Sequence, residues 1–61
     1  MNRDKLQIKM AECNFSNAEL SRAVGITEAY ISQIVNGLRI PSVEVAKRIA
    51  EALNCKIDDL V

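Results

Sequence analysis

The chain has no histidine and no tryptophan, and its 61 residues include only two cysteines, one proline and two glycines. Without histidine it lacks the side chain that most often acts as a general base near neutral pH. It also contains no glycine-rich phosphate loop and no nucleophile elbow. We therefore expect no enzymatic activity. We also expect no small-molecule ligand, because so small a core leaves little room for a pocket of about 300 Å³ or more.

The two cysteines, Cys13 and Cys55, are far apart in the sequence and form no CxxC pair. Structural zinc usually requires about four cysteine or histidine ligands, so we expect neither a metal site nor another cofactor. Small buried thiols in a reducing compartment are the favoured interpretation. A disulfide between the two cysteines and a redox switch are the alternatives.

Long apolar runs and excess charge are also missing. No run approaches the ~20 residues of a membrane span, and the charged, amphipathic N-terminus does not have the pattern of a secretory signal. We expect a cytoplasmic protein without a membrane partner. Eight basic and eight acidic residues balance to a net charge of 0. The whole chain therefore offers no bulk attraction to polyanions, although its charges can still be segregated.

Helical periodicity is what the chain does contain. Apolar residues make up 49% of it, which is enough for one compact core in a single domain, 1–61. Leu6, Met10 and Cys13 recur at the four-then-three spacing of one helical face and predict a helix over about 3–13. Asn2 can cap its beginning, and Asn14 is a plausible left-handed residue at its end.

The most informative segment is SNAELSRAVGITEAYISQIVNG, residues 16–37. Ser16 is followed three residues later by Glu19, a capping box that begins a helix over about 17–24. Gly25 follows where the chain must reverse, because glycine enters the left-handed region without steric cost. The segment therefore predicts a helix that ends in a tight turn.

A second helix is predicted directly after this turn, over about 28–36. Thr27 can cap it, Ile31 and Ile34 lie three apart on its inner side, and Gly37 ends it. When two helices are joined by so short a turn, the second helix projects from the surface of the domain. That shape fits the major groove of DNA.

Residues 37–61 predict three further elements. A loop over 37–41 is followed by a helix over about 43–53, which Ser42 caps, and by a short helix near 57–60. Pro41 prevents the helix from resuming early. The inner side of the 43–53 helix consists of small and aliphatic residues, namely Ala46, Ile49, Ala50 and Leu53. The expected fold is all-α, a compact bundle of four helices plus a short fifth.

The chain as a whole resembles the helix-turn-helix proteins of the Cro and phage-repressor type, often called the XRE family. The motif positions are Asn17, Leu20, Ser21, Gly25 and Ile31, followed by Asn36-Gly37, Pro41-Ser42, Ile49-Ala50, Leu53 and Asp58-Asp59-Leu60. The resemblance runs roughly from Leu6 to the end of the chain. It implies a lambda-repressor-like DNA-binding domain, with the helix-turn-helix at about 17–36 and double-stranded DNA as the partner.

The chain departs from this family at two places. Several relatives carry an arginine and a glutamate, paired between the first and third helices, where this chain has Met10 and Val35. We expect these two side chains to touch and to replace the ion pair by packing, the alternative being an exposed valine. Relatives usually cap the fifth helix with Ser or Thr near position 56, where this chain has Lys56. Asp58 and Asp59 are expected to support that helix through its dipole.

The resemblance places the base-reading side chains on the outward side of the 28–36 helix: Glu28, Ala29, Ser32 and Gln33. Gln33 can pair with adenine, Glu28 can accept from cytosine N4, and Ala29 can meet a thymine methyl, while Ser32 suits several bases. Each has a plainer alternative. Glu28 can simply complement the helix dipole, and the two small residues can serve close packing.

Phosphate contacts are expected from residues that flank this helix, namely Asn17, Thr27, Tyr30, Asn36, Arg39 and Ser42. Arg39 is favoured as the charge contact, its alternative being an unpaired, solvated arginine. Tyr30 can pack between helices with its hydroxyl reaching a phosphate. The balanced charge predicts few ionic contacts and a shallow salt dependence.

Proteins of this type usually bind palindromic operators as homodimers, so we predict a transcriptional repressor that dimerises. Ile57, Leu60 and Val61 are the candidate dimer surface, to which Ile40 can be added; the alternative for them is intrachain core. A rival function is a protein-interaction module on the same fold, such as an antitoxin or anti-repressor partner, favoured slightly by the neutral charge and by Val35 and Ile40. A domain of a longer regulator is a further alternative, although the initial methionine favours a complete small protein.

Overall fold

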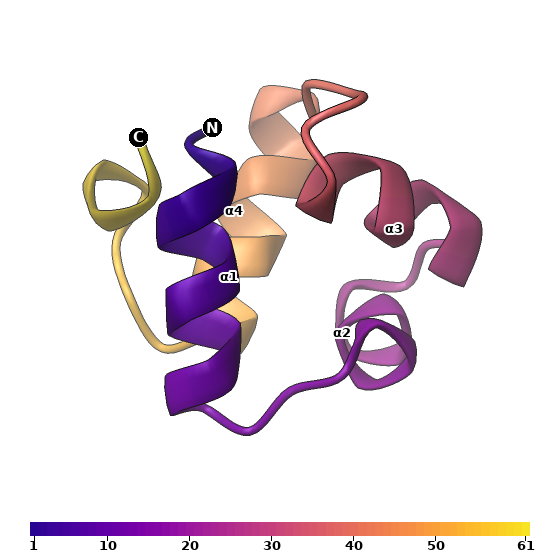
Figure 1. Cartoon of the computed structure of the whole chain (residues 1–61), viewed down its shortest axis with the longest axis horizontal. Coiled ribbons are helices and arrows are strands. Elements are labelled where there is room, and N and C mark those ends of the chain that lie inside the picture. The colour runs from indigo at the N-terminus through magenta and orange to yellow at the C-terminus, as the bar shows by residue number, and fades with distance from the viewer.

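Four α-helices and a final 3-10 helix make up the structure, a computed structural model that describes residues 1–61. The elements are α1 (Arg3–Glu12), α2 (Asn17–Val24), α3 (Glu28–Val35), α4 (Val43–Ala52) and η1 (Ile57–Leu60). In Figure 1, α1 and α4 lie in the middle of the molecule, with α2 and α3 on one side of them and η1 on the other. The predicted all-α architecture is confirmed.

Every α-helix begins at the residue that the sequence predicts. The Asn2 Oδ1 accepts from two backbone N–H groups of α1 at 2.9 and 3.2 Å. Ser16 and Glu19 form the complete capping box at the beginning of α2, with distances of 3.1 and 3.2 Å. Thr27 and Ser42 each accept from the third N–H of their helix at 3.2 Å. Each cap contributes about 1 kcal/mol to helix stability.

The ends of the helices depend on four residues with positive φ. Asn14 has a φ of 62° and Gly25 a φ of 81°, while Gly37 and Asn54 have φ angles of 76° and 55°. These residues lie at or just after the places where the sequence predicts each helix to end. α1, α3 and α4 each stop one residue before the predicted boundary, because the last predicted residue forms the C-cap.

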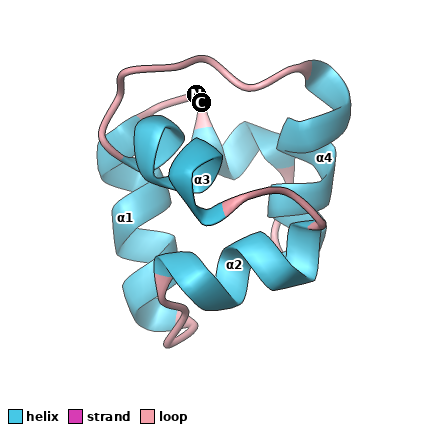
Figure 2. Ribbon diagram, turned by 90° about the vertical axis from the view of Figure 1, so that its right-hand side faces the viewer, coloured by secondary structure: helices cyan, strands magenta, loops and turns pink.

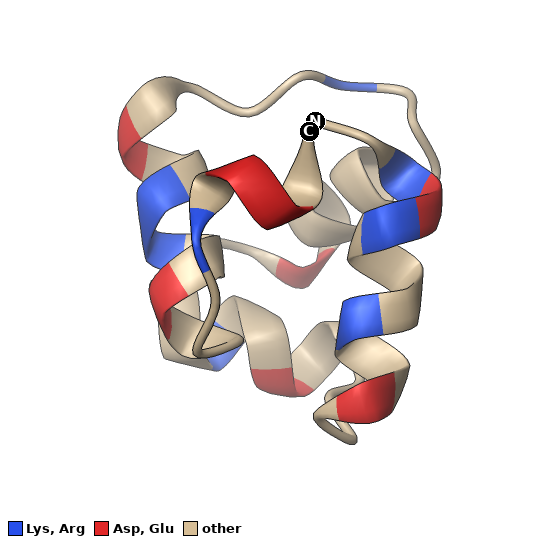
Figure 3. Cartoon of the chain, turned by 90° about the vertical axis from the view of Figure 1, so that its left-hand side faces the viewer, with Lys and Arg blue, Asp and Glu red and all other residues tan.

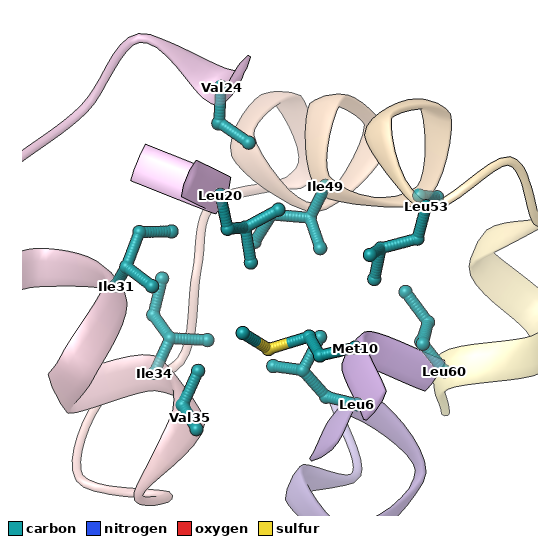
Figure 4. Close-up of a cluster of buried hydrophobic side chains, with 11 residues drawn as sticks. Leu6, Met10, Leu20, Val24, Ile31, Ile34, Val35, Ile49, Leu53 and Leu60 are labelled. Atoms are coloured by element: carbon teal, nitrogen blue, oxygen red, sulfur yellow. The ribbon is translucent and has the colours of Figure 1, made fainter. Parts of the chain in front are cut away.

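One core cluster draws on all four α-helices and on η1. Its fully buried side chains are Leu6, Leu20, Ile31, Ile49, Leu53 and Leu60. Figure 4 shows these side chains converging from the surrounding helices. Ile31 and Ile34 face inward at 0% and 3% exposure, which confirms the predicted inner side of α3. Ala46, predicted to lie inward on α4, is only half-buried.

Apolar packing joins α1 to α3 at Met10 and Val35, the two positions at which the resemblance implies an ion pair. Met10 is 5% exposed and Val35 is 9% exposed, and both belong to the core cluster. In Figure 4 the thioether end of Met10 points toward Ile34 and Val35. The alternative of an exposed Val35 is therefore wrong, and apolar burial takes the place of the pair.

The end of the chain folds back onto α1. The Asn2 backbone N–H donates to the Leu60 carbonyl at 2.7 Å, and the Lys5 Nζ donates to the Val61 carbonyl at 2.6 Å. At the beginning of η1 the Asp59 carboxylate accepts from the Lys56 backbone N–H at 3.1 Å. This is the half of a capping box in which the third residue of the helix accepts from the N-cap N–H, and the Lys56 side chain itself makes no cap hydrogen bond.

The two cysteines are free thiols with different surroundings. Cys55 is half-buried, and this burial raises the pKa of its thiol despite the opposing charge of Lys9. Cys13 is exposed, so the prediction of a buried thiol is wrong for it. The reason is local: α1 ends at Glu12, and Cys13 sits at the C-cap with its Sγ 3.4 Å from the Leu53 carbonyl. No helix is both long and apolar enough to cross a bilayer.

Candidate nucleic-acid interface

The turn between α2 and α3 holds the two helices against each other. Gly25 takes the left-handed conformation, and its N–H donates to the Ser21 carbonyl at 2.9 Å. Ser21 is 7% exposed, and its hydroxyl donates to the Ala18 carbonyl at 2.7 Å. A small residue with an internally satisfied hydroxyl can be buried without cost to packing or to hydrogen bonding. Figure 2 shows α2 across the front of the molecule and α3 above it.

The outward side of α3 is free of the chain's own core. Glu28, Ala29 and Gln33 are exposed, and Ser32 is half-buried, whereas Ile31 and Ile34 face inward. The structure therefore brings the four predicted base-reading residues to one helix surface. The contacts they make with bases stay a prediction.

Of the residues predicted to contact phosphate, Thr27, Tyr30 and Asn36 belong to α3 or its caps, Arg39 follows in the loop, Asn17 begins α2 and Ser42 caps α4. Asn17 occupies the first position of α2 and is half-buried. The Asn36 Nδ2 donates to the Ser32 Oγ at 3.4 Å, which ties the end of α3 to its outward side. The hydroxyls of Thr27 and Ser42 accept cap hydrogen bonds, and each keeps its own proton for another acceptor.

Arg39 is held in place by two side chains of α3. Its Nε donates to the Gln33 Oε1 at 2.8 Å, and its guanidinium carbon lies 5.0 Å from the centroid of the Tyr30 ring. Tyr30 itself is half-buried against the core. Arg39 is exposed and takes part in no ion pair, but its side chain is hydrogen-bonded to Gln33 and lies over the Tyr30 ring. Sequence reasoning treated Gln33 and Arg39 as independent, because no periodic pattern links residues across a helix end.

The charges around the interface are few and balanced. The segment 16–42 contains two arginines and two glutamates. Arg48, on α4, is paired with Glu44 at 2.7 Å. On the side that carries η1, Figure 3 shows basic and acidic residues interspersed along the helices, with an acidic η1 in the foreground. Neither sign forms a large continuous field on that side. Around α3 the two arginines and two glutamates of the segment 16–42 balance each other.

The predicted dimer surface needs correction. Leu60 is 0% exposed and belongs to the core, since η1 packs against α1 and α4. Ile57 is half-buried against the same core, and Val61 is 59% exposed. Sequence reasoning named Ile40, which is 85% exposed, but missed two exposed apolar neighbours in the chain. These are Leu38, at 79%, and Val43, at 71%.

A helical bundle whose second and third helices are joined by a glycine turn, with a polar outward surface on the third, defines a helix-turn-helix domain. The family model for helix-turn-helix proteins matches residues 6–60. A Bacillus subtilis (strain 168) protein, YqaF, named an uncharacterized HTH-type transcriptional regulator, is 42% identical over 53 residues, which cover 87% of this chain and 70% of the relative. No solved structure matches significantly. The chain belongs to the XRE-type helix-turn-helix family of DNA-binding transcriptional regulators.

Proposed function

We propose that residues 1–61 form a single domain that binds double-stranded DNA sequence-specifically through α3. In this proposal it represses transcription by occupying a palindromic operator as a homodimer. The observation that carries the proposal is the outward side of α3, which is mostly polar and lies outside the core, with the exposed Arg39 side chain bonded to one of its residues. Its members are Glu28, Ala29, Ser32 and Gln33.

Base recognition follows from the chemistry of these side chains. An amide such as that of Gln33 can form a bidentate pair with adenine, and a carboxylate such as that of Glu28 accepts from cytosine N4. Ala29 offers a methyl group for a thymine methyl, and the Ser32 hydroxyl can donate or accept. Each good bidentate pair discriminates against a wrong base by about 1–3 kcal/mol.

Backbone contacts would set the position of α3 in the groove. Asn17 begins α2, where free backbone N–H groups and the helix dipole favour an anion. Arg39 has terminal N–H groups that are not used in its bond to Gln33, so they can donate to a phosphate. Thr27, Tyr30, Asn36 and Ser42 complete the proposed set of phosphate contacts.

Dimerisation would place two α3 helices in successive major grooves, about 34 Å apart. Leu60 cannot take part, because it is fully buried within its own chain. The exposed apolar residues Leu38, Ile40 and Val43 are the better candidates, with Val61 as a further contact. Sedimentation in the presence of a selected operator tests this, since two chains per DNA duplex are expected.

Selection of bound sites from random DNA tests the proposed function directly. The wild-type chain is expected to enrich a palindromic site. Gln33→Ala should lose preference at one base pair of each half-site while keeping the others. Lys56→Ala is the matched control, because Lys56 precedes η1, which lies away from α3 in Figure 1. Its selected site should be unchanged. No enriched site from folded wild-type protein would contradict the proposal.

A protein-interaction module is the second candidate. The exposed side chains of Leu38, Ile40 and Val43 favour it, together with a net charge of 0. A partner that docks on these residues would be displaced by Ile40→Asp, which adds a charge to an apolar contact. Under this alternative the folded chain would bind a protein partner with no sequence preference for DNA.

A further inference from the structure

Arg39 follows α3 in the loop to α4, yet it returns to touch the outward side of α3. Its Nε lies 2.8 Å from the Gln33 Oε1, and its guanidinium lies over the Tyr30 ring at 5.0 Å. Tyr30 and Gln33 are three residues apart, so they are neighbours on one surface of the helix. A residue outside the recognition helix is therefore fixed to a side chain that is placed to read bases.

The chemistry of arginine settles how the Gln33 amide is turned. A guanidinium only donates hydrogen bonds, so the amide atom facing the Arg39 Nε must be the oxygen. The amide NH₂ of Gln33 is then directed away from Arg39. Donor and acceptor of this side chain therefore have defined positions before any DNA is bound.

The stacking on Tyr30 makes this arrangement specific to arginine. Arginine combines a planar group that rests on an aromatic ring with an Nε–H that donates in the same plane. A lysine at this place would keep the positive charge, but it has neither the plane nor the Nε–H. Tyr30 packs against the core, so the guanidinium is supported by the folded domain rather than by another mobile side chain.

We propose that Arg39 is a positioning residue that determines base preference through Gln33, although it touches no base itself. By holding the Gln33 oxygen it presents the amide to the major groove in one orientation. Its terminal N–H groups remain available to a phosphate, so one side chain would link backbone binding to base reading. This inference rests on the proposed base-reading role of Gln33.

Arg39→Lys separates the positioning role from a purely ionic one. The wild-type chain is expected to prefer its base at the Gln33 position by about ten- to a hundredfold. Arg39→Lys removes the planar group that rests on Tyr30 and the Nε–H, so the amide is held less firmly. This preference should fall about three- to tenfold, while the dependence of affinity on salt stays the same. The double variant with Gln33→Ala should show no further loss beyond Gln33→Ala alone. Arg22→Lys, an exposed arginine of α2, is the matched control and should leave the preference unchanged.

The outcomes distinguish this inference from the proposed function. If Gln33→Ala loses the preference but Arg39→Lys keeps it in full, Arg39 acts only as a phosphate contact and the inference is overturned. If the wild-type chain has no preference at any base pair, the proposed function itself fails. The free protein gives an independent check by NMR. An NOE between the Arg39 Hε and the Gln33 side chain is expected, and its absence from the folded domain would overturn the inference without reference to DNA.

Discussion

Gln7 of α1 donates a hydrogen bond from its side-chain amide to the backbone carbonyl of Val35, the last residue of α3, at 2.8 Å. Arg3 donates in the same way to the carbonyl of Asn36 at 3.1 Å. Both acceptors belong to the end of α3, where carbonyls have no partner within the helix. Side chains of α1 thus satisfy carbonyls at the C-terminal end of α3, the helix that is proposed to read DNA. These bonds hold the end of α3 against α1.

Gln7→Ala should destabilise the domain by about 1 kcal/mol, because the partly buried Val35 carbonyl loses its donor. Urea unfolding followed by circular dichroism measures the change. Gln33→Ala is the matched control: it makes the same substitution on the exposed side of α3, where surface changes usually stay within about 0.5 kcal/mol. Equal losses from the two variants would show that the Gln7 bond contributes nothing particular.

Met10 and Val35 lie in the same core cluster, so the loss of stability from a substitution at one position should depend on the residue at the other. Val35→Glu alone should cost at least about 2 kcal/mol, because it places an unpaired carboxylate in the core. Adding Met10→Arg should recover part of this loss by pairing the charge. A double-mutant cycle of unfolding free energies measures the coupling. Additive losses would contradict the view that these two positions share one contact region.

The two glycines should differ in their response to alanine. Both have positive φ, so each substitution carries a backbone cost of about 1 kcal/mol. A Cβ on Gly25 would meet nothing within 4 Å, whereas one on Gly37 would lie 3.0 Å from the Arg3 Cδ. Gly37→Ala must also move the Arg3 side chain, which donates to Asn36. Thermal unfolding should therefore show a larger loss for Gly37→Ala, and the reverse order would contradict this reasoning.

The two thiols should react at different rates. Cys13 is exposed, whereas Cys55 is half-buried with a pKa raised above its ordinary value of 9.0 by burial. An aromatic disulfide reagent at pH 8 should therefore modify Cys13 first, because the thiolate is the reacting form. Single Cys→Ser variants assign the two phases, and equal rates would contradict the difference in environment.

The raised pKa of Cys55 also has a consequence for stability. The folded state holds the thiol proton more tightly than the unfolded chain, so this contribution is full below the unfolded pKa. It is lost as the pH rises through the folded pKa. Wild-type stability should consequently decline between neutral pH and about pH 10 more steeply than that of Cys55→Ser. Parallel profiles of the two proteins would contradict the assignment.

The sequence predicts the helices well because their boundaries depend on local chemistry. The hydroxyls of Ser16, Thr27 and Ser42 cap helices wherever they precede an amphipathic run, and Gly25 turns the chain without help from distant residues. These signals lie within a few residues of the features that they specify. They were sufficient to predict the positions of α2 and α3, and the spacing of Ile31 and Ile34 predicted the inward side of α3.

Contacts between distant side chains were not predictable in this way. The Gln7–Val35 and Gln33–Arg39 bonds depend on how the helices pack and where the α3–α4 loop runs. Leu60 lies on an apolar face of the predicted last helix, but such a face can pack against the chain's own core or against a second chain. The sequence pattern is the same in both cases. Packing of η1 against α1 and α4 decides that Leu60 belongs to the core.

An NMR titration of the isotope-labelled chain with its selected operator tests the central claim most directly. The largest shifts of backbone and side-chain signals should come from α3 between Glu28 and Gln33, with Arg39 and the beginning of α2 next. Signals of η1, which lies away from α3 in Figure 1, should change least. Shifts that centre on η1 or on the outer side of α4, with α3 unaffected, would contradict the assignment of α3 as the DNA-reading helix.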